Sequence, residues 1–186
     1  VFHGKGLRHF GVELEIDDGG TVNSNAQKLL DIANKDAENL YIKTDGSLDD
    51  GLALVTHPMT LDYHLNEMPW AEILRKARSM DYLSHAAGIC GLHVHISRLT
   101  FGCTYEQQEA SIARLLYFVE KFWAELLRFI RRTQGQMNRW AARYGMKLTP
   151  TDQMCHAKNK ILNTLARECQ VRSTDATGIA YNFNDR

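Results

Sequence analysis

The sequence predicts an α+β protein in which helices cover one face of a sheet. Segments with the period of a strand are short, and segments with the period of a helix separate them. The first strand-like segment has an apolar side and an acidic side, which is typical of a sheet with one face in solvent. The chain has 186 residues, 44% of them hydrophobic, and no repeat or Pro/Gly-rich linker, so we expect one domain over residues 1–186.

The first predicted strand covers residues 9–16, where apolar residues alternate with glycine and glutamate at a period of two. A turn rich in Asp and Gly follows at residues 17–20. Further strands are predicted at residues 41–43, 52–57, 88–97 and 179–183.

Helical periodicity marks the intervals between these strands. It occurs at residues 25–40, 60–82, 103–132 and 151–169. Pro69 is expected to break the second of these helices or to begin a new one. The third has the widest apolar stripe, and Thr104 with Gln107 predicts a capping box at its start.

Charge and cysteine content narrow the class of protein. Lys+Arg and Asp+Glu are both 22, so the chain lacks the net basic field that general nucleic-acid binders and membrane-surface proteins need. No apolar run approaches the roughly 20 residues that span a bilayer, and no secretory signal opens the sequence. The four cysteines are widely spaced, which favours reduced thiols and a cytoplasmic location.

Two carboxylates in the first strand are candidate metal ligands. Glu13 and Glu15 project from one face of a strand, roughly 6–7 Å apart. Carboxylates at that spacing repel each other unless a cation lies beside them, and their oxygens suit Mg²⁺ or Mn²⁺. A solvent-exposed strand face with alternating Glu is the simpler alternative.

Two histidines form a similar pair in the strand at residues 88–97. His93 and His95 share one face, where imidazoles can bind a metal or contact phosphate; a pair of partly buried histidines with hydrogen-bond partners inside the protein is the alternative. Gly88 and Gly91 precede them and allow a ligand to approach the backbone closely. Lys43, before the Asp45-Gly46 turn, is a candidate partner for phosphate or carboxylate.

The order of these motifs resembles that of the amidoligase family, which is similar to glutamine synthetases and glutamate–cysteine ligases. The resemblance extends from about Phe10 to Phe183, and it is most specific near Glu13 and His93. The segments that carry it are Phe10-Gly11-Val12-Glu13-Leu14-Glu15, Asp45-Gly46-Ser47-Leu48, Leu54-Val55-Thr56-His57-Pro58 and Gly91-Leu92-His93-Val94-His95-Ile96-Ser97.

The resemblance implies a glutamine-synthetase-like catalytic domain with a curved, mainly antiparallel sheet that binds ATP and Mg²⁺ or Mn²⁺. It assigns catalysis and metal binding to Glu13, Glu15 and His93. It assigns contacts with the nucleotide to Lys43, His93, His95 and Ser97. The implied reaction activates a small-molecule or peptide carboxylate as an acyl phosphate, which an amine then attacks to give an amide.

The chain departs from the family pattern in two places. The strand before the Thr-x-Pro element usually carries a glutamate that completes the metal cluster, and here the matching residue is Ala53. The family pattern also continues beyond Tyr181-Asn182-Phe183 into a last catalytic strand, which we expect this 1–186 domain to lack.

Three functions therefore stay open. The first is an ATP-dependent carboxylate–amine ligase. The second, favoured by Ala53, is an impaired relative that binds nucleotide or peptide without turnover. The third is a metal-dependent hydrolase that uses the two glutamates and the two histidines. The sequence identifies neither the acid and amine substrates nor the oligomeric state.

Overall fold

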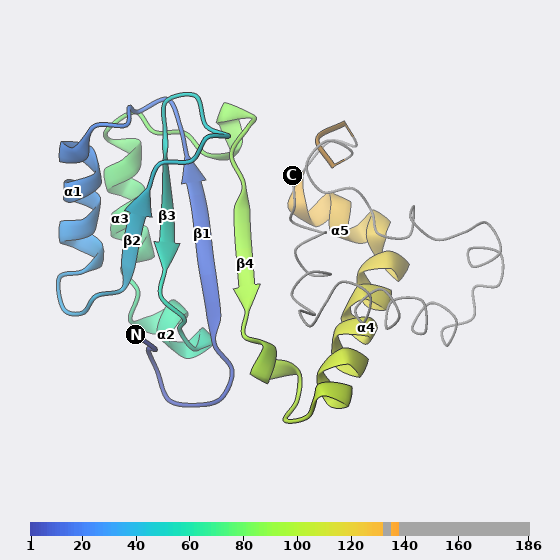
Figure 1. Cartoon of the computed structure of the whole chain (residues 1–186). Coiled ribbons are helices and arrows are strands. Elements are labelled where there is room, and N and C mark those ends of the chain that lie inside the picture. Colours follow the sequence, from blue (N-terminus) through green and yellow to red (C-terminus); the bar gives the residue numbers. More distant parts are fainter. Residues whose placement is uncertain (132–134, 138–186) are drawn as a thin grey trace. The chain divides into compact units, whose positions relative to one another are not determined.

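The computed structural model describes residues 1–131 and 135–137, drawn in colour in Figure 1. The chain divides into two compact units, Val1–Thr100 and Phe101–Arg186. The helix expected at residues 151–169 and the strand expected at residues 179–183 lie outside the described residues. The expectation of one domain over residues 1–186 stays a prediction.

The first unit contains a four-stranded antiparallel sheet, which confirms the mixed α and β composition predicted from the sequence. The strands are β1 (Phe10–Ile16), β2 (Leu40–Lys43), β3 (Leu52–Thr56) and β4 (Leu92–Ile96). Their order across the sheet is β2-β3-β1-β4, so β1 is an inner strand with β3 on one side and β4 on the other (Figure 1).

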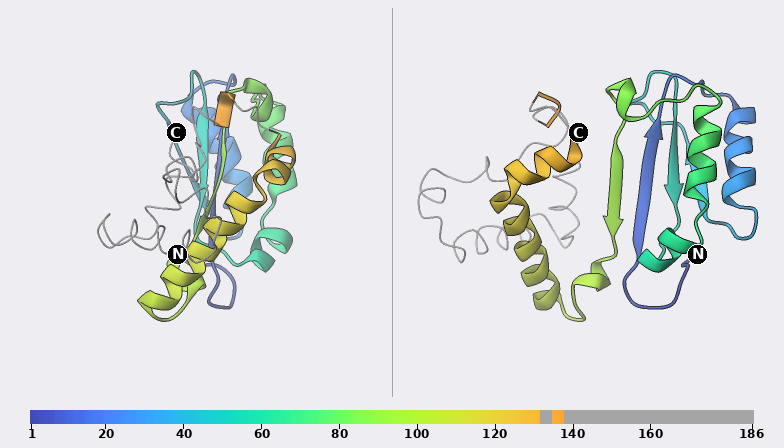
Figure 2. Two further views of the ribbon diagram at one scale, coloured as in Figure 1. Left: turned by 90° about the vertical axis from the view of Figure 1, so that its right-hand side faces the viewer. Right: turned by 180° about the vertical axis from the view of Figure 1, so that it is seen from behind.

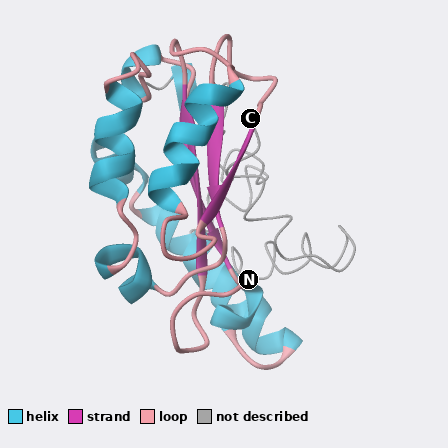
Figure 3. Cartoon of the chain, turned by 90° about the vertical axis from the view of Figure 1, so that its left-hand side faces the viewer, coloured by secondary structure: helices cyan, strands magenta, loops and turns pink. Residues whose placement is uncertain are grey.

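Three helices lie on one face of this sheet, as the sequence predicts. They are α1 (Asn23–Ala33), α2 (Leu61–Asn66) and α3 (Trp70–Arg78), and the views in Figures 2 and 3 show the opposite face without a helix of this unit. Leu54 of β3, Leu29 of α1 and Ile73 of α3 are fully buried in the core between the two layers. Burial of apolar surface between sheet and helices is the main stabilising contribution to this unit.

Two of the predicted helices are shorter than their periodicity suggests. Helix α1 ends at Ala33 because the amide of Asn34 binds the start of β2: its Oδ1 accepts from the backbone N–H groups of Asn39 and Leu40, at 2.9 and 3.0 Å. The segment at residues 60–82 forms α2 and α3, and Pro69 occupies the N-cap of α3. Pro69 therefore separates two helices, as expected.

The second unit contains two described helices, α4 (Tyr105–Lys121) and α5 (Trp123–Ile130). The capping box is confirmed, since Thr104 Oγ1 accepts from the backbone N–H of Gln107 and the Gln107 side chain returns to Thr104. The single helix expected over residues 103–132 is interrupted at Phe122, whose backbone leaves the helical region.

Two 3-10 helices complete the described elements, at His85–Ala87 and Arg98–Phe101. Strand β4 consequently begins at Leu92, later than the expected residue 88. Within residues 1–131 and 135–137, no helix is both long and apolar enough to cross a membrane.

The loop between β2 and β3 is held by a buried carboxylate. Asp17 is almost fully buried, and its two oxygens accept from the backbone N–H groups of Asp49 and Asp50 at 3.2 and 2.7 Å. Gly51 packs directly against Asp17 and the carbonyl oxygen of Ile16. This contact fixes the loop between β2 and β3, which also carries Asp45.

We predict that Gly51→Ala lowers the free energy of unfolding by about 2 kcal/mol, because a methyl group has no space in this contact. The added Cβ would lie 2.6 Å from Asp17 Oδ1 and 2.8 Å from its Cα. Gly46→Ala is the matched control in the same loop, since its Cβ would meet nothing within 4 Å. Urea denaturation of both variants measures the difference, and equal stabilities would contradict the prediction.

Candidate functional site

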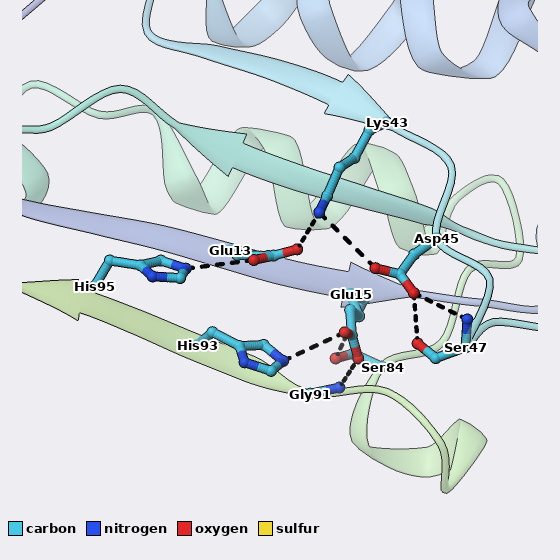
Figure 4. Close-up of polar contacts among 9 residues, drawn as sticks. All are labelled: Glu13, Glu15, Lys43, Asp45, Ser47, Ser84, Gly91, His93 and His95. Carbon is cyan, nitrogen blue, oxygen red and sulfur yellow. Dashed lines mark hydrogen bonds and ion pairs between the residues drawn. The ribbon is translucent and has the colours of Figure 1, made fainter. Parts of the chain in front are cut away.

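The face of the sheet away from the helices carries a cluster of charged side chains (Figure 4). Leu14 and Ile16 of β1 pack into the core, so Glu13 and Glu15 project from the opposite face. The antiparallel pairing places Glu13 directly opposite His93 and Gly11 directly opposite His95. The two carboxylates and the two imidazoles are therefore neighbours, although Glu13 and His95 are 82 positions apart in the chain.

Each glutamate pairs with one histidine, and both pairings are diagonal across β1 and β4. Glu13 Oε2 lies 3.3 Å from His95 Nε2, although His93 is its partner in the register. Glu15 Oε1 lies 3.3 Å from His93 Nε2. The two histidines thus lean along β4 toward consecutive carboxylates on β1, as Figure 4 shows.

The other two carboxylate oxygens also have partners. Glu13 Oε1 lies 2.8 Å from Lys43 Nζ. Glu15 Oε2 accepts a short hydrogen bond from the backbone N–H of Gly91. The side chains of Glu13 and Glu15 are only 14% and 9% exposed, so these contacts offset a real loss of hydration.

Lys43 also reaches the turn that follows it. Its Nζ lies 3.9 Å from Asp45 Oδ2. Asp45 Oδ1 in turn accepts from the hydroxyl and the backbone N–H of Ser47, at 2.7 and 2.9 Å. The Asp-Gly turn predicted from the sequence is therefore also part of the charged cluster.

The contacts shift three pKa values. Burial alone would raise the pKa of Glu13, but the ammonium of Lys43 and the imidazole of His95 hold it below its ordinary value. The hydrogen bond to Glu13 raises the pKa of Lys43. The hydroxyl of Ser47 lowers the pKa of Asp45. All three groups are therefore charged at neutral pH.

Cys90, which lies just before β4, is not suited to nucleophilic chemistry. Burial, together with the acidic side chains of Asp17 and Glu15, raises the pKa of its thiol to about 12. At neutral pH the thiol stays protonated, and the thiolate is the reactive form of cysteine.

Most residues that the sequence singles out make the polar contacts of this cluster, and Ser97 lies two residues beyond His95 at its far end. Glu13, Glu15, His93, His95 and Lys43 form the cluster. Ser97 lies beyond the end of β4, where its N–H donates to the carbonyl oxygen of His9. That position is six residues along β4 from Gly91, or about 20 Å, so Ser97 lies well away from Lys43 and Glu15.

Ala53 lies inside the cluster, where the family pattern has a glutamate. The register places it between Glu15 of β1 and Lys43 of β2. Ala53 is on the same face as both, and it is 0% exposed. The residue without a ligand oxygen is therefore at the centre of the charged face.

Sequence reasoning missed Ser84 as a contributor to the site, and it assigned Gly91 only to the close approach of a ligand. Ser84 donates from Oγ to the backbone carbonyl of Glu15, at 2.9 Å, and Gly91 binds the Glu15 carboxylate through its N–H. Neither has a local signal, because each acts through a contact with a strand about seventy residues away. A motif search also depends on side-chain types, and Gly91 contributes a backbone N–H that no side-chain pattern marks.

The donor chemistry fits a divalent cation, but the side chains do not yet surround one. Glu13 and Glu15 offer the hard oxygens that Mg²⁺ prefers, with His93 beside them. Among residues 1–131 and 135–137, however, no three His, Cys, Asp or Glu side chains form a group that could hold a metal ion. A cation at Glu13 would have to displace Lys43, which now neutralises that carboxylate.

Comparisons with known proteins add no assignment. No family model matches the chain, and neither a curated protein nor a solved structure is significantly similar to it. The functional argument therefore depends on the geometry of this face and on the motif order.

We predict that Lys43→Met lowers the free energy of unfolding by about 0.5 kcal/mol at neutral pH, the range of a partly exposed ion pair. Glu13 has a lowered pKa, so its contribution is present above the ordinary value of 4.5 and is lost as the pH falls through the lowered one. Lys43 has a raised pKa, so its contribution is present below 10.5 and is lost as the pH rises through the raised one.

Urea denaturation of wild type and Lys43→Met at acidic, neutral and alkaline pH measures this difference. We expect the gap in stability to be largest at neutral pH and to close at both extremes. A gap that stays constant across the pH range would show that the Lys43–Glu13 ion pair does not cause it.

Proposed function

We propose that the chain is an ATP-dependent carboxylate–amine ligase whose active site is the charged face of the sheet. The observation that carries the proposal is the pairing of Glu13 with His95 and of Glu15 with His93 on the sheet face that no helix of this unit covers. Such a face offers oxygen ligands for a cation beside imidazoles that can contact phosphate. The motif order that resembles amidoligases supports the same reaction.

The antiparallel sheet with helices on one face is compatible with a glutamine-synthetase-like domain, and that finer fold is part of the proposal. In such a domain the reaction takes place on the sheet face that the helices leave open. Glu13 and Glu15 are on that face here.

The proposed reaction has two steps. A carboxylate oxygen of the acid substrate attacks the γ-phosphorus of ATP, and ADP leaves. The amine then attacks the acyl carbon, loses a proton, and expels inorganic phosphate with the electrons of the C–O bond. A divalent ion bound with the nucleotide supplies charge neutralisation and orientation for both transfers.

The residues of this chain have separate tasks in that scheme. Glu13 and Glu15 hold the cation. His93 and His95 orient those carboxylates and face the phosphates, and Lys43 neutralises negative charge at the β2 side of the face. None of these tasks requires a protein nucleophile, which agrees with the protonated thiol of Cys90.

The activity test incubates the full chain with Mg²⁺, ATP and mixtures of carboxylic acids and amines, and it measures phosphate release. We expect release only when an acid and an amine are both present, and a loss of at least about 100-fold in Glu13→Gln, since charge stabilisation is the main catalytic contribution. Glu72→Gln is the control, because Glu72 is an exposed residue of helix α3. Release that needs neither acid nor amine would contradict the ligase.

Ala53 favours a second candidate, an impaired relative that binds nucleotide without turnover. Its buried methyl group lies where a third carboxylate would complete the cluster. This candidate predicts that wild type and Ala53→Glu both bind an ATP analogue and that neither releases phosphate.

We predict that Ala53→Glu increases the affinity for Mg²⁺ about tenfold, because ligand charge sets the affinity of such sites. If the chain is a ligase, Ala53→Glu also increases the rate of phosphate release. Calorimetric titration with Mg²⁺ measures the affinity, and the gain of Ala53→Glu over Ala53→Gln, which has a similar size, isolates the contribution of the charge. Unchanged Mg²⁺ binding in a folded Ala53→Glu variant would contradict the assignment of the site.

A further inference from the structure

The side chain of Lys43 crosses a whole strand to reach its partner. Lys43 is on β2 and Glu13 is on β1, and β3 lies between these strands. Two strand spacings amount to about 10 Å, which requires an extended lysine side chain lying flat over the face. Figure 4 shows this path, with the ammonium above β3 and directed at Glu13.

Ala53 is the residue over which this path runs. It is the register partner of Lys43 on one side and of Glu15 on the other. Although Ala53 is on the face without helices, it is 0% exposed, so neighbouring side chains cover its methyl group completely. A larger residue at position 53 would stand between the lysine and Glu13.

The ammonium occupies the place that a cation bound to Glu13 would need. It lies 2.8 Å from Glu13 Oε1, and the other oxygen of that carboxylate faces His95 at 3.3 Å. Asp45, 3.9 Å from the same ammonium, fixes it from the other side. Two carboxylates hold this one ammonium, so a divalent cation at Glu13 Oε1 would have to displace it from both contacts.

We propose that Lys43 is a built-in counter-ion that competes with divalent cations for Glu13, and that Ala53 leaves the space for it to do so. The chain thereby supplies Glu13 with its own counter-ion, and Glu13 binds a divalent ion only when the lysine moves away. This deepens the proposed function, since it rests on Glu13 as a cation ligand and describes how access to that ligand is controlled.

The test is calorimetric titration of the full-length chain with Mn²⁺ alone. We expect Lys43→Met to bind Mn²⁺ about twofold more tightly than wild type, the factor that corresponds to the loss of one partly exposed ion pair. Lys28→Met is the matched control, because it removes the same charge from an exposed position on helix α1. Equal affinities in Lys43→Met and Lys28→Met would overturn the proposal.

A second variant separates competition for Glu13 from a general change of charge. Ala53→Leu leaves the net charge unchanged but obstructs the path of Lys43 over β3, so it too should tighten Mn²⁺ binding. Circular dichroism and thermal unfolding verify that it folds, and Ala53→Val replaces it if it does not. Wild-type affinity in a folded variant of either kind would overturn the role of Ala53.

The outcomes also distinguish this proposal from the ligase. Tighter Mn²⁺ binding in Lys43→Met, without phosphate release under any substrate mixture, would support the counter-ion and contradict the ligase. Phosphate release by wild type, with unchanged Mn²⁺ affinity in Lys43→Met, would support the ligase and contradict the counter-ion.

Discussion

The pairing of β1 with its two neighbours is the constraint on which the site depends. In the observed register, the apolar residues of β1 face the helices while Glu13 and Glu15 project from the opposite face beside β4. A shift of one residue would turn both carboxylates into the apolar core, at a cost of several kcal/mol for each buried charge. The same burial that stabilises the sheet therefore also determines where the charges can be.

Both glutamates of the charged face have partners from within the chain. Glu13 is held by an ammonium and an imidazole, and Glu15 by an imidazole and a backbone N–H. The ammonium and the imidazole hold the pKa of Glu13 below its ordinary value, so this carboxylate stays ionised at neutral pH without a metal ion. A cation that binds here must replace these internal partners. Its net affinity is therefore the free energy of its own contacts minus that of the contacts it replaces.

Local patterns were reliable where neighbours in the sequence decide the structure. The alternation along β1 and the capping box of Thr104 are confirmed because each depends on residues only two or three positions apart. Helix ends were less predictable: α1 stops where Asn34 binds the start of β2, although the helical period continues beyond it. The helical periodicity indicates only which residues can be buried. It contains no sign of a side-chain hydrogen bond, such as that of Asn34, that ends the helix earlier.

The sequence by itself determined that the two glutamates share one face of a strand and that the two histidines share one face of another, since side chains alternate along any strand. Tertiary structure decided that these two faces are the same face, which histidine meets which glutamate, and that Lys43 crosses over Ala53. Those relations join strands that are far apart in the chain. Their register follows from packing against the helices, which no local pattern contains.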